Sequence, residues 1–169
     1  EVRAEMGVAQ LPAITILSTT SPTGGKIAEY FQGLIKQHLD IDVKVDQQTF
    51  KQYIDKVNRQ EFDIALASWY PDFDDVVTYA DLLASYNENN DGRYISKAYD
   101  NWLAELMNSA DPAERMAAAD QLQKLIQADV AVIPMAETGS AYLQHPKLRG
   151  VVRRVLGADP DYTFARVIE

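Results

Sequence analysis

Hydrophobic and polar positions in the first 68 residues follow strand and helix periods in turn. The β-branched run "AITILS" (13–18) predicts a buried strand, and the alternating "IDVKVD" (41–46) predicts a half-covered or edge strand. A helical stripe separates them, and a capping box formed by Thr49 and Gln52 opens a second helix before "FDIALAS" (62–68). This β-α-β-α-β order with helix-length crossovers predicts a parallel sheet. Because 62–68 has the most continuous apolar run, we expect this third strand well inside the sheet.

The second half of the chain predicts helices followed by short strands. Residues 74–86 and 96–110 have helical patterns, and 111–129 is the clearest helix, with Asp111 as its N-cap. The apolar run "VAVIPM" (130–135) predicts a buried strand. Shorter strand-like pieces are expected at 140–144, 150–155 and 162–168.

Length and composition fit one folded domain over residues 1–169. With 47% hydrophobic and 24% charged residues, the chain can bury a core, and no repeat or low-complexity linker divides it. The element pattern predicts an α/β fold with a mostly parallel sheet flanked by helices. The opening "EVRAEMGVAQ" (1–10) lacks the apolar segment of a signal peptide and is typical of a helix end cut from a longer chain, so we expect a fragment.

Charge and residue counts narrow the chemistry. A formal net charge of -9 argues against nucleic acid or an anionic membrane surface as a partner, and it permits a cationic ligand. The absence of cysteine excludes disulfides, thiolate metal sites and cysteine nucleophiles. No apolar stretch approaches the roughly 18 residues that a membrane span needs.

Three motif-like features do not meet the requirements of metal, phosphate or catalytic sites. "NENNDGR" (87–93) imitates the start of an EF-hand loop, but Ala98 occupies the position of the essential glutamate. "TGGK" (23–26) lacks the first glycine and the final hydroxyl residue of a phosphate loop. His38 and His145 are far apart and have no partner at ligand spacing. We therefore expect no metal, no cofactor and no enzymatic activity.

The strand exit "FDIALASWYPDFDD" (62–75) is the candidate site for a ligand. In open α/β sheets, ligands bind beyond the carboxyl ends of the strands. We expect Asp74 or Asp75 to cap the helix that follows, which leaves Asp72 free to face a cationic ligand. A position in the core is the alternative for Trp69.

Five segments follow one another in order over nearly the whole chain: "FDIALASWYPDFDD", "NENNDGRY", "YDNWL", "DPAERMAAADQLQKLIQADVAVIPM" and "HPKLRGVV". Together they resemble the bacterial oligopeptide-binding proteins. These proteins form the peptide and nickel class of extracytoplasmic solute-binding proteins, which feed ABC importers. The resemblance implies a three-layer, periplasmic-binding-protein-like (type II) lobe, and it identifies the chain as the C-terminal lobe of a longer two-lobe protein.

The resemblance also implies the residues of the site. In oligopeptide-binding members, the aspartate of a W-x-x-D pattern takes the α-ammonium of the peptide, so Asp72 inherits that role. Trp69, Tyr70 and Phe73 are the further ligand-binding residues that we expect. Phe73 departs from the tyrosine common in relatives, and Leu66 stands where some members carry an arginine for the carboxylate of the ligand. This last departure leaves peptide length open.

The implied function is the capture of extended oligopeptides outside the cytoplasm, by main-chain hydrogen bonds and Asp72. We expect a monomer that is membrane-anchored at full length and has ABC permease subunits and its own other lobe as partners. Two alternatives stay open. One is a lobe used for contact with a permease or receptor, and the other is a family member that binds a non-peptide ligand such as a nickel chelate or haem.

Overall fold

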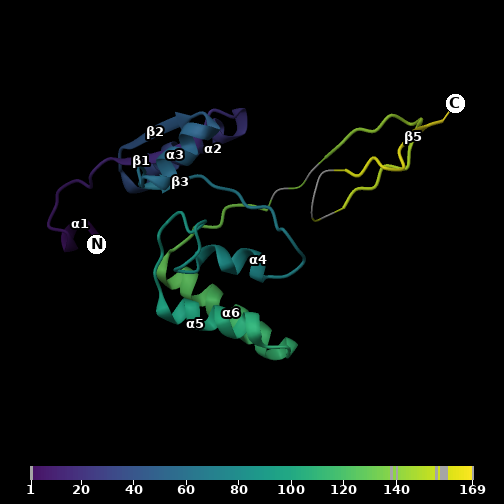
Figure 1. The fold of residues 1–169 in the computed structure, drawn as a ribbon. Helices are drawn as coiled ribbons and strands as arrows, with labels where there is room; N and C mark the ends of the chain where they lie inside the picture. The colour runs from purple at the N-terminus through teal and green to yellow at the C-terminus, as the bar shows by residue number, and fades with distance from the viewer. Residues whose placement is uncertain (1, 138, 140, 155, 157–159, 169) are drawn as a thin grey trace. The chain divides into compact units, whose positions relative to one another are not determined.

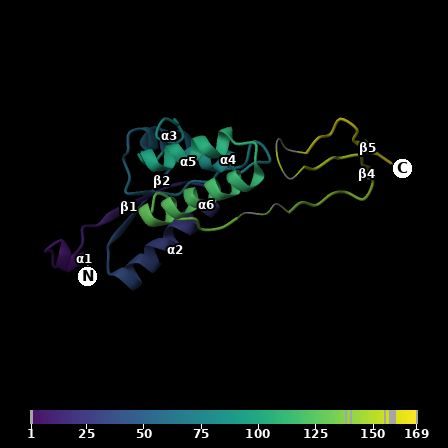
Figure 2. The same ribbon diagram turned by 90° about the horizontal axis from the view of Figure 1, so that it is seen from below.

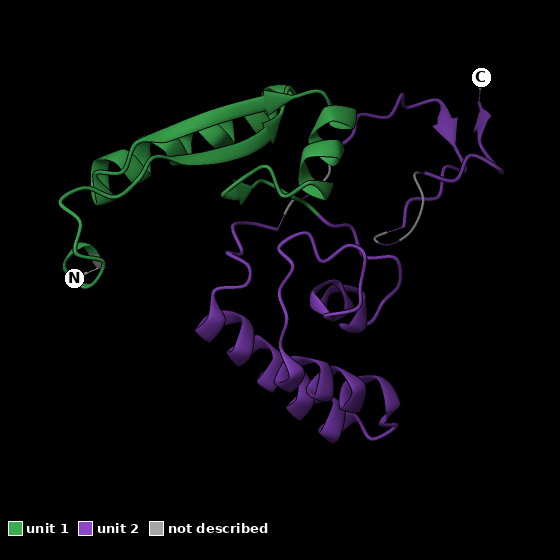
Figure 3. Cartoon of the chain, turned by 60° about the vertical axis from the view of Figure 1, so that its left-hand side comes forward, with its two compact units in different colours: residues 1–68 green, residues 69–169 purple. Residues whose placement is uncertain are grey.

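The computed structural model describes residues 2–137, 139, 141–154, 156 and 160–168. It divides the chain into two compact units, residues 1–68 and residues 69–169, which have different colours in Figure 3. Each unit has a hydrophobic core of its own. The sequence predicts a single domain over residues 1–169, and this remains a prediction, because two compact units can belong to one domain.

Three parallel strands form the sheet of the first unit, in the order β2-β1-β3 (Figure 1). β1 spans Ile14–Thr19, β2 spans Val43–Gln48 and β3 spans Ile64–Ala65. β1 pairs with β2 along its whole length and with β3 over two residues. The predicted β-α-β-α-β order, the parallel pairing and the edge position of β2 are confirmed.

The third strand lies at an edge of this sheet in the part of the chain that the structure describes, so the prediction of an inner position is wrong. On either side of its two ladder residues one backbone bond continues the pairing: the Asp63 N–H donates to the Thr15 carbonyl at 3.2 Å, and the Leu66 N–H donates to the Leu17 carbonyl at 3.0 Å. Its apolar run is continuous because both faces are covered: Ile64 packs against the cluster around Ile16, and Phe62 packs against the cluster around Leu17. Apolar continuity therefore reports covered faces and says little about strand order.

Helices cover the two faces of the sheet and give three layers. Ile16 of β1 packs with Ala28 of α2, whereas Leu17, the next residue, packs with Tyr53 of α3. Successive strand residues point to opposite faces, so α2 and α3 lie on opposite sides of the sheet. A short helix at the start of the chain, α1 (Val2–Glu5), precedes these layers.

Capping residues set the starts of both covering helices. α2 (Pro22–Leu39) follows Ser21, whose Oγ accepts a backbone N–H of the first turn. α3 (Phe50–Asn58) begins with the capping box of Thr49 and Gln52, as the sequence predicts.

The described part of the second unit contains four helical segments. α5 and α6 pack against each other side by side (Figure 2) and confirm the helices predicted at 96–110 and 111–129. The helix predicted at 74–86 is much shorter in the structure, because it forms only α4 and a single turn of 3-10 helix. In the described ranges, no helix has the length and apolar character to cross a membrane. The segments are α4 (Val77–Ala80), η1 (Asp81–Leu83), α5 (Lys97–Asn108) and α6 (Pro112–Asp129).

Polar groups inside the core of this unit are hydrogen-bonded. The Tyr99 hydroxyl donates to the Ala80 carbonyl at 2.8 Å, and burial raises the pKa of Tyr99 above its ordinary value. The Asn90 side chain is 3% exposed, and its amide nitrogen donates to the Tyr94 carbonyl at 2.7 Å. The asparagine-rich segment 87–93 is thus a structural turn whose side chains bond backbone groups.

Residues 130–135 form no strand, so the predicted buried strand is wrong. α6 ends at Asp129, and Val130 takes a left-handed conformation with φ 52°. Val132, Ile133 and Met135 are 47%, 65% and 47% exposed. Residues with β propensity form a strand only where a neighbouring strand supplies a ladder, and no described strand pairs with this segment.

The last part of the chain carries two short antiparallel strands, β4 (Leu148–Arg149) and β5 (Arg166–Val167). β5 lies within the strand predicted at 162–168, whereas the strand predicted at 150–155 forms only an isolated bridge between Val152 and Asp161. Of the strand predicted at 140–144, residues 141–144 are not in a strand. Ser140 and Val155 lie outside the described residues.

Candidate ligand-binding site

The candidate site lies on the loop of residues 69–76, which follows β3 in the chain and leads into α4. All of this loop belongs to the second unit. Its geometry can therefore be described against α4, α5 and α6, with which it shares that unit.

Hydrogen bonds hold the backbone of this loop. The Asp72 N–H donates to Thr78 Oγ1 at 3.0 Å, and Thr78 is only 5% exposed. The Asp75 N–H donates to the Phe73 carbonyl at 3.0 Å, and the Thr78 N–H donates to the Asp75 carbonyl at 3.2 Å. These bonds fix the backbone at Asp72 relative to the first turn of α4.

Asp75 is the carboxylate that serves the start of α4. Its Oδ1 accepts the Val77 N–H at 2.9 Å, and its Oδ2 lies 2.5 Å from Arg115 Nη2. The sequence predicts Asp74 or Asp75 as the N-cap of this helix. Val76 occupies the N-cap position instead, and Asp75, one residue earlier, supplies the carboxylate that accepts the first helical N–H. Both oxygens of Asp75 are therefore engaged.

Asp72 and Asp74 differ from Asp75 because their side chains are exposed. Within the described ranges, neither carboxylate has a hydrogen bond or an ion pair. Asp72 is thus held through its backbone while its carboxylate stays open to solvent. Its role in ligand binding stays a prediction.

Three aromatic side chains flank this carboxylate along the chain. Trp69, Tyr70 and Phe73 are 39%, 72% and 50% exposed. The exposure of Trp69 does not support the alternative that it is a core residue. Exposed aromatic rings beside a carboxylate give a surface with both apolar and negatively charged parts, which suits an amphipathic cation.

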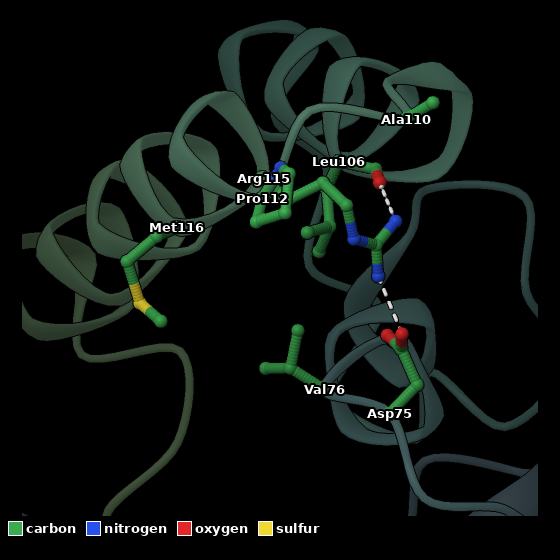
Figure 4. A pocket seen from close by; sticks show the side chains of 7 residues that line it. All are labelled: Asp75, Val76, Leu106, Ala110, Pro112, Arg115 and Met116. Atoms are coloured by element: carbon green, nitrogen blue, oxygen red, sulfur yellow. Dashed lines mark hydrogen bonds and ion pairs between the residues drawn. The ribbon is translucent and has the colours of Figure 1, made fainter.

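A pocket of about 460 Å³ borders the loop where α4 begins (Figure 4). Arg115, near the start of α6, lies along its wall: Nη1 donates to the Leu106 carbonyl, and Nη2 donates to Asp75. The Arg115 and Asp75 side chains are 25% and 37% exposed. The pocket is lined by Asp75, Val76, Leu106, Ala110, Pro112, Arg115 and Met116.

Two residues that shape the loop are not found from the sequence. Arg115 is 40 residues from Asp75, and no period or motif connects the two positions. Thr78 is one hydroxyl residue in a short helical pattern, and nothing in that pattern indicates that its oxygen bonds the Asp72 backbone. Arginines and threonines are common on helix surfaces, so only the fold distinguishes these two.

No group of three His, Cys, Asp or Glu side chains among the described residues is placed to hold a metal ion. The three carboxylates of the loop do not form such a group, because Asp75 is engaged with Val77 and Arg115. His145 Nδ1, in a separate segment, accepts the Lys147 N–H at 3.2 Å.

The model of the bacterial extracellular solute-binding proteins, family 5 Middle, matches residues 2–91. Among curated proteins, the chain is 28% identical over 148 residues to the dipeptide-binding protein DppE of Bacillus subtilis, covering 88% of this chain and 27% of DppE. It is 31% identical over 137 residues to the periplasmic murein peptide-binding protein MppA of Escherichia coli, covering 81% of this chain and 26% of MppA. The chain thus spans about a quarter of the length of these relatives.

Solved structures give the same picture. The substrate-binding domain of an oligopeptide ABC transporter from Bacillus anthracis superposes with a TM-score of 0.85 at 27% identity, covering 99% of this chain and 33% of that one. The unliganded open form of the murein tripeptide-binding protein MppA gives 0.73 at 31% identity, covering 77% and 26%. The predicted fold class, an α/β fold with a mostly parallel sheet flanked by helices of the periplasmic-binding-protein-like type II, is confirmed by these matches.

Proposed function

The chain belongs to family 5 of the bacterial extracellular solute-binding proteins, and we propose that it is the lobe of a longer, two-lobe protein that holds the amino end of a bound oligopeptide. The observation that carries the proposal is the state of Asp72, whose carboxylate is exposed and unpaired among the described residues while its backbone is fixed by Thr78. A cation at this position meets a carboxylate that has no competing partner among the described residues.

Asp72 would bind the α-ammonium of the peptide by a charge-assisted hydrogen bond. Such bonds are shorter and roughly twice as strong as neutral ones. The neighbouring rings of Trp69, Tyr70 and Phe73 would cover apolar parts of the first residues of the peptide, and they would also shield the ion pair from water. Main-chain hydrogen bonds to the extended peptide would supply affinity without reading its side chains.

The relatives favour a peptide over the other ligands considered for this class of protein. DppE is named for dipeptides, MppA for murein peptides and OppA of Escherichia coli for oligopeptides. On this basis we propose delivery to the permease subunits of an ABC importer, a location outside the cytoplasm with a membrane anchor at full length, and action as a monomer. The second lobe of the full-length protein would close over the ligand.

Replacing Asp72 tests the proposal directly. In the full-length protein, Asp72→Asn is expected to weaken binding of a free-amino peptide at least about tenfold, because removing one partner of a desolvated charge pair costs about 2–5 kcal/mol. Calorimetry with the same peptide, free and N-acetylated, measures the effect. Acetylation removes the ammonium, so wild type should prefer the free peptide and Asp72→Asn should lose much of this preference.

Asp74→Asn is the matched control, because Asp74 is also exposed and unpaired among the described residues of the same loop. It removes the same charge two residues away and is expected to change affinity by less than about threefold, the effect of a screened surface charge. Equal affinities of wild type and Asp72→Asn for the free peptide would refute the role of Asp72.

A further inference from the structure

The loop of the candidate site has an unusual concentration of negative charge. Asp72, Asp74 and Asp75 lie within four residues. Like charges this close repel one another, and α4 has only four residues, so its dipole offers little compensation. A positive partner for one of these carboxylates would favour a single conformation of the loop.

Arg115 supplies this partner from α6. Its guanidinium donates to Asp75 Oδ2 through Nη2 and to the Leu106 carbonyl, near the end of α5, through Nη1 (Figure 4). The planar fork of an arginine can hold both acceptors at once, which the single ammonium of a lysine does with less fixed geometry. The loop is thereby tied to both helices of the α5–α6 pair.

The position of Arg115 in its own helix does not explain its presence. It is the fourth residue of α6, which begins at Pro112. A cation near a helix N-terminus interacts unfavourably with the helix dipole. The side chain turns away from its own helix toward the Leu106 carbonyl and Asp75, which is where its charge is compensated.

A continuous series of bonds runs from Arg115 to the candidate ligand-binding residue. Arg115 holds Asp75 Oδ2, Asp75 Oδ1 accepts the Val77 N–H, and the Asp75 carbonyl accepts the Thr78 N–H. Thr78 Oγ1 in turn accepts the Asp72 N–H. Every link lies between residues of the second unit.

We propose that Arg115 is a positioning residue for the site: through Asp75 it holds the loop and the start of α4 in the conformation that presents the Asp72 carboxylate. The part of this inference that concerns ligand affinity rests on the proposed function. The part that concerns the loop does not, because the conformation of the loop can be measured without a ligand.

Hydrogen exchange of the full-length protein tests the loop. In Arg115→Gln, the amides of Asp72 and Val77 are expected to exchange about tenfold faster, which corresponds to about 1.4 kcal/mol. The amide of Leu103, fully buried in the core of the same unit, should keep its rate. Lys124→Gln, which breaks the exposed ion pair with Asp120 on the same helix, is the matched control and should change neither loop amide.

Peptide affinity separates positioning from simple charge compensation. Arg115→Gln is expected to weaken binding about tenfold, and Arg115→Lys should recover part of the loss. In the double variant Arg115→Met/Asp75→Asn the charges cancel as in wild type, but the side chain at position 115 can no longer donate a hydrogen bond to residue 75, so affinity should stay low. Restoration of wild-type affinity in this double variant would overturn the positioning role.

The outcomes for the two proposals are distinguishable. If Asp72→Asn binds peptide like wild type, the proposed function is refuted, and the exchange rates still decide whether Arg115 holds the loop. If Asp72→Asn weakens binding while Arg115→Gln changes neither affinity nor the exchange of the Asp72 and Val77 amides, the proposed function stands and the role of Arg115 is refuted.

Discussion

The hydroxyl of Thr78 offers a way to disturb the backbone of the candidate site without touching its charges. Thr78→Val keeps the size of the side chain and removes the acceptor of the Asp72 N–H, which lies 3.0 Å away. We expect Thr78→Val to lower peptide affinity by more than another substitution of Thr78 that costs a similar unfolding free energy but keeps the hydroxyl.

The structure gives the expected loss of unfolding free energy for Thr78→Val and for a matched variant. Leaving a buried donor unsatisfied costs about 1–3 kcal/mol, and because Asp72 itself is exposed, water can partly replace Thr78, which puts the cost at about 1 kcal/mol. Thr78→Ser is the matched variant: it loses one methyl group, about 0.8 kcal/mol, and keeps the acceptor.

Urea unfolding and calorimetry with a free-amino peptide, both on the full-length protein, compare the two variants. Similar losses of unfolding free energy are expected, together with a fall in affinity of about fivefold for Thr78→Val and less than about twofold for Thr78→Ser. Equal affinities of the two variants would refute the reasoning, because the bond to Asp72 would then have no part in presenting its carboxylate.

Two further predictions concern stability. Burial raises the pKa of Tyr99, so the folded chain keeps the hydroxyl proton at pH values where the unfolded chain begins to lose it. The unfolding free energy should therefore fall as pH rises above about 10. Urea titrations across that range should show a shallower fall in Tyr99→Phe than in wild type. Gly150 has φ 77°, and an added Cβ would lie 2.0 Å from the Phe164 carbonyl oxygen, so Gly150→Ala should abolish the NMR cross-strand contacts between β4 and β5. Gly139→Ala, where a Cβ meets nothing within 4 Å, should leave them intact, and surviving contacts in Gly150→Ala would contradict the close approach.

The elements of the first unit are predictable because their signals are local. Thr49 and Gln52 satisfy each other across three residues, and the alternation of 41–46 already indicates an edge strand. Such signals depend only on residues close together in the sequence, and the elements that they predict are present in the structure.

Strand partners are not predictable in the same way, because a ladder is a property of two segments. The apolar side chains of residues 62–68 face two covering helices, and among the described residues this segment has one neighbouring strand, β1. Residues 130–135 have a similar composition and no ladder in the described part of the chain. A segment with β propensity therefore forms a strand only if another segment of the fold pairs with it.

The candidate site shows the same division between local and distant information. The split of the carboxylates is visible in the sequence, because a carboxylate just before a helix tends to cap it. The sequence does not show that Arg115, 40 residues away, fixes Asp75. The sequence around the loop thus identifies Asp72 as the candidate residue, but it does not identify Arg115, which contacts the loop from a distant part of the chain.

The three carboxylates of the loop also bear on which cation the site favours. Both oxygens of Asp75 are engaged, by Val77 and by Arg115, so only Asp72 and Asp74 have oxygens to offer. A hard dication such as Ca²⁺ needs about six to eight oxygen ligands, and Mg²⁺ needs near-ideal octahedral geometry. An ammonium group has three N–H donors and can be satisfied by one carboxylate, such as that of Asp72, with help from water. By engaging Asp75, Arg115 removes oxygens that a metal ion would need, and the remaining carboxylate oxygens suit an ammonium group better than a metal ion.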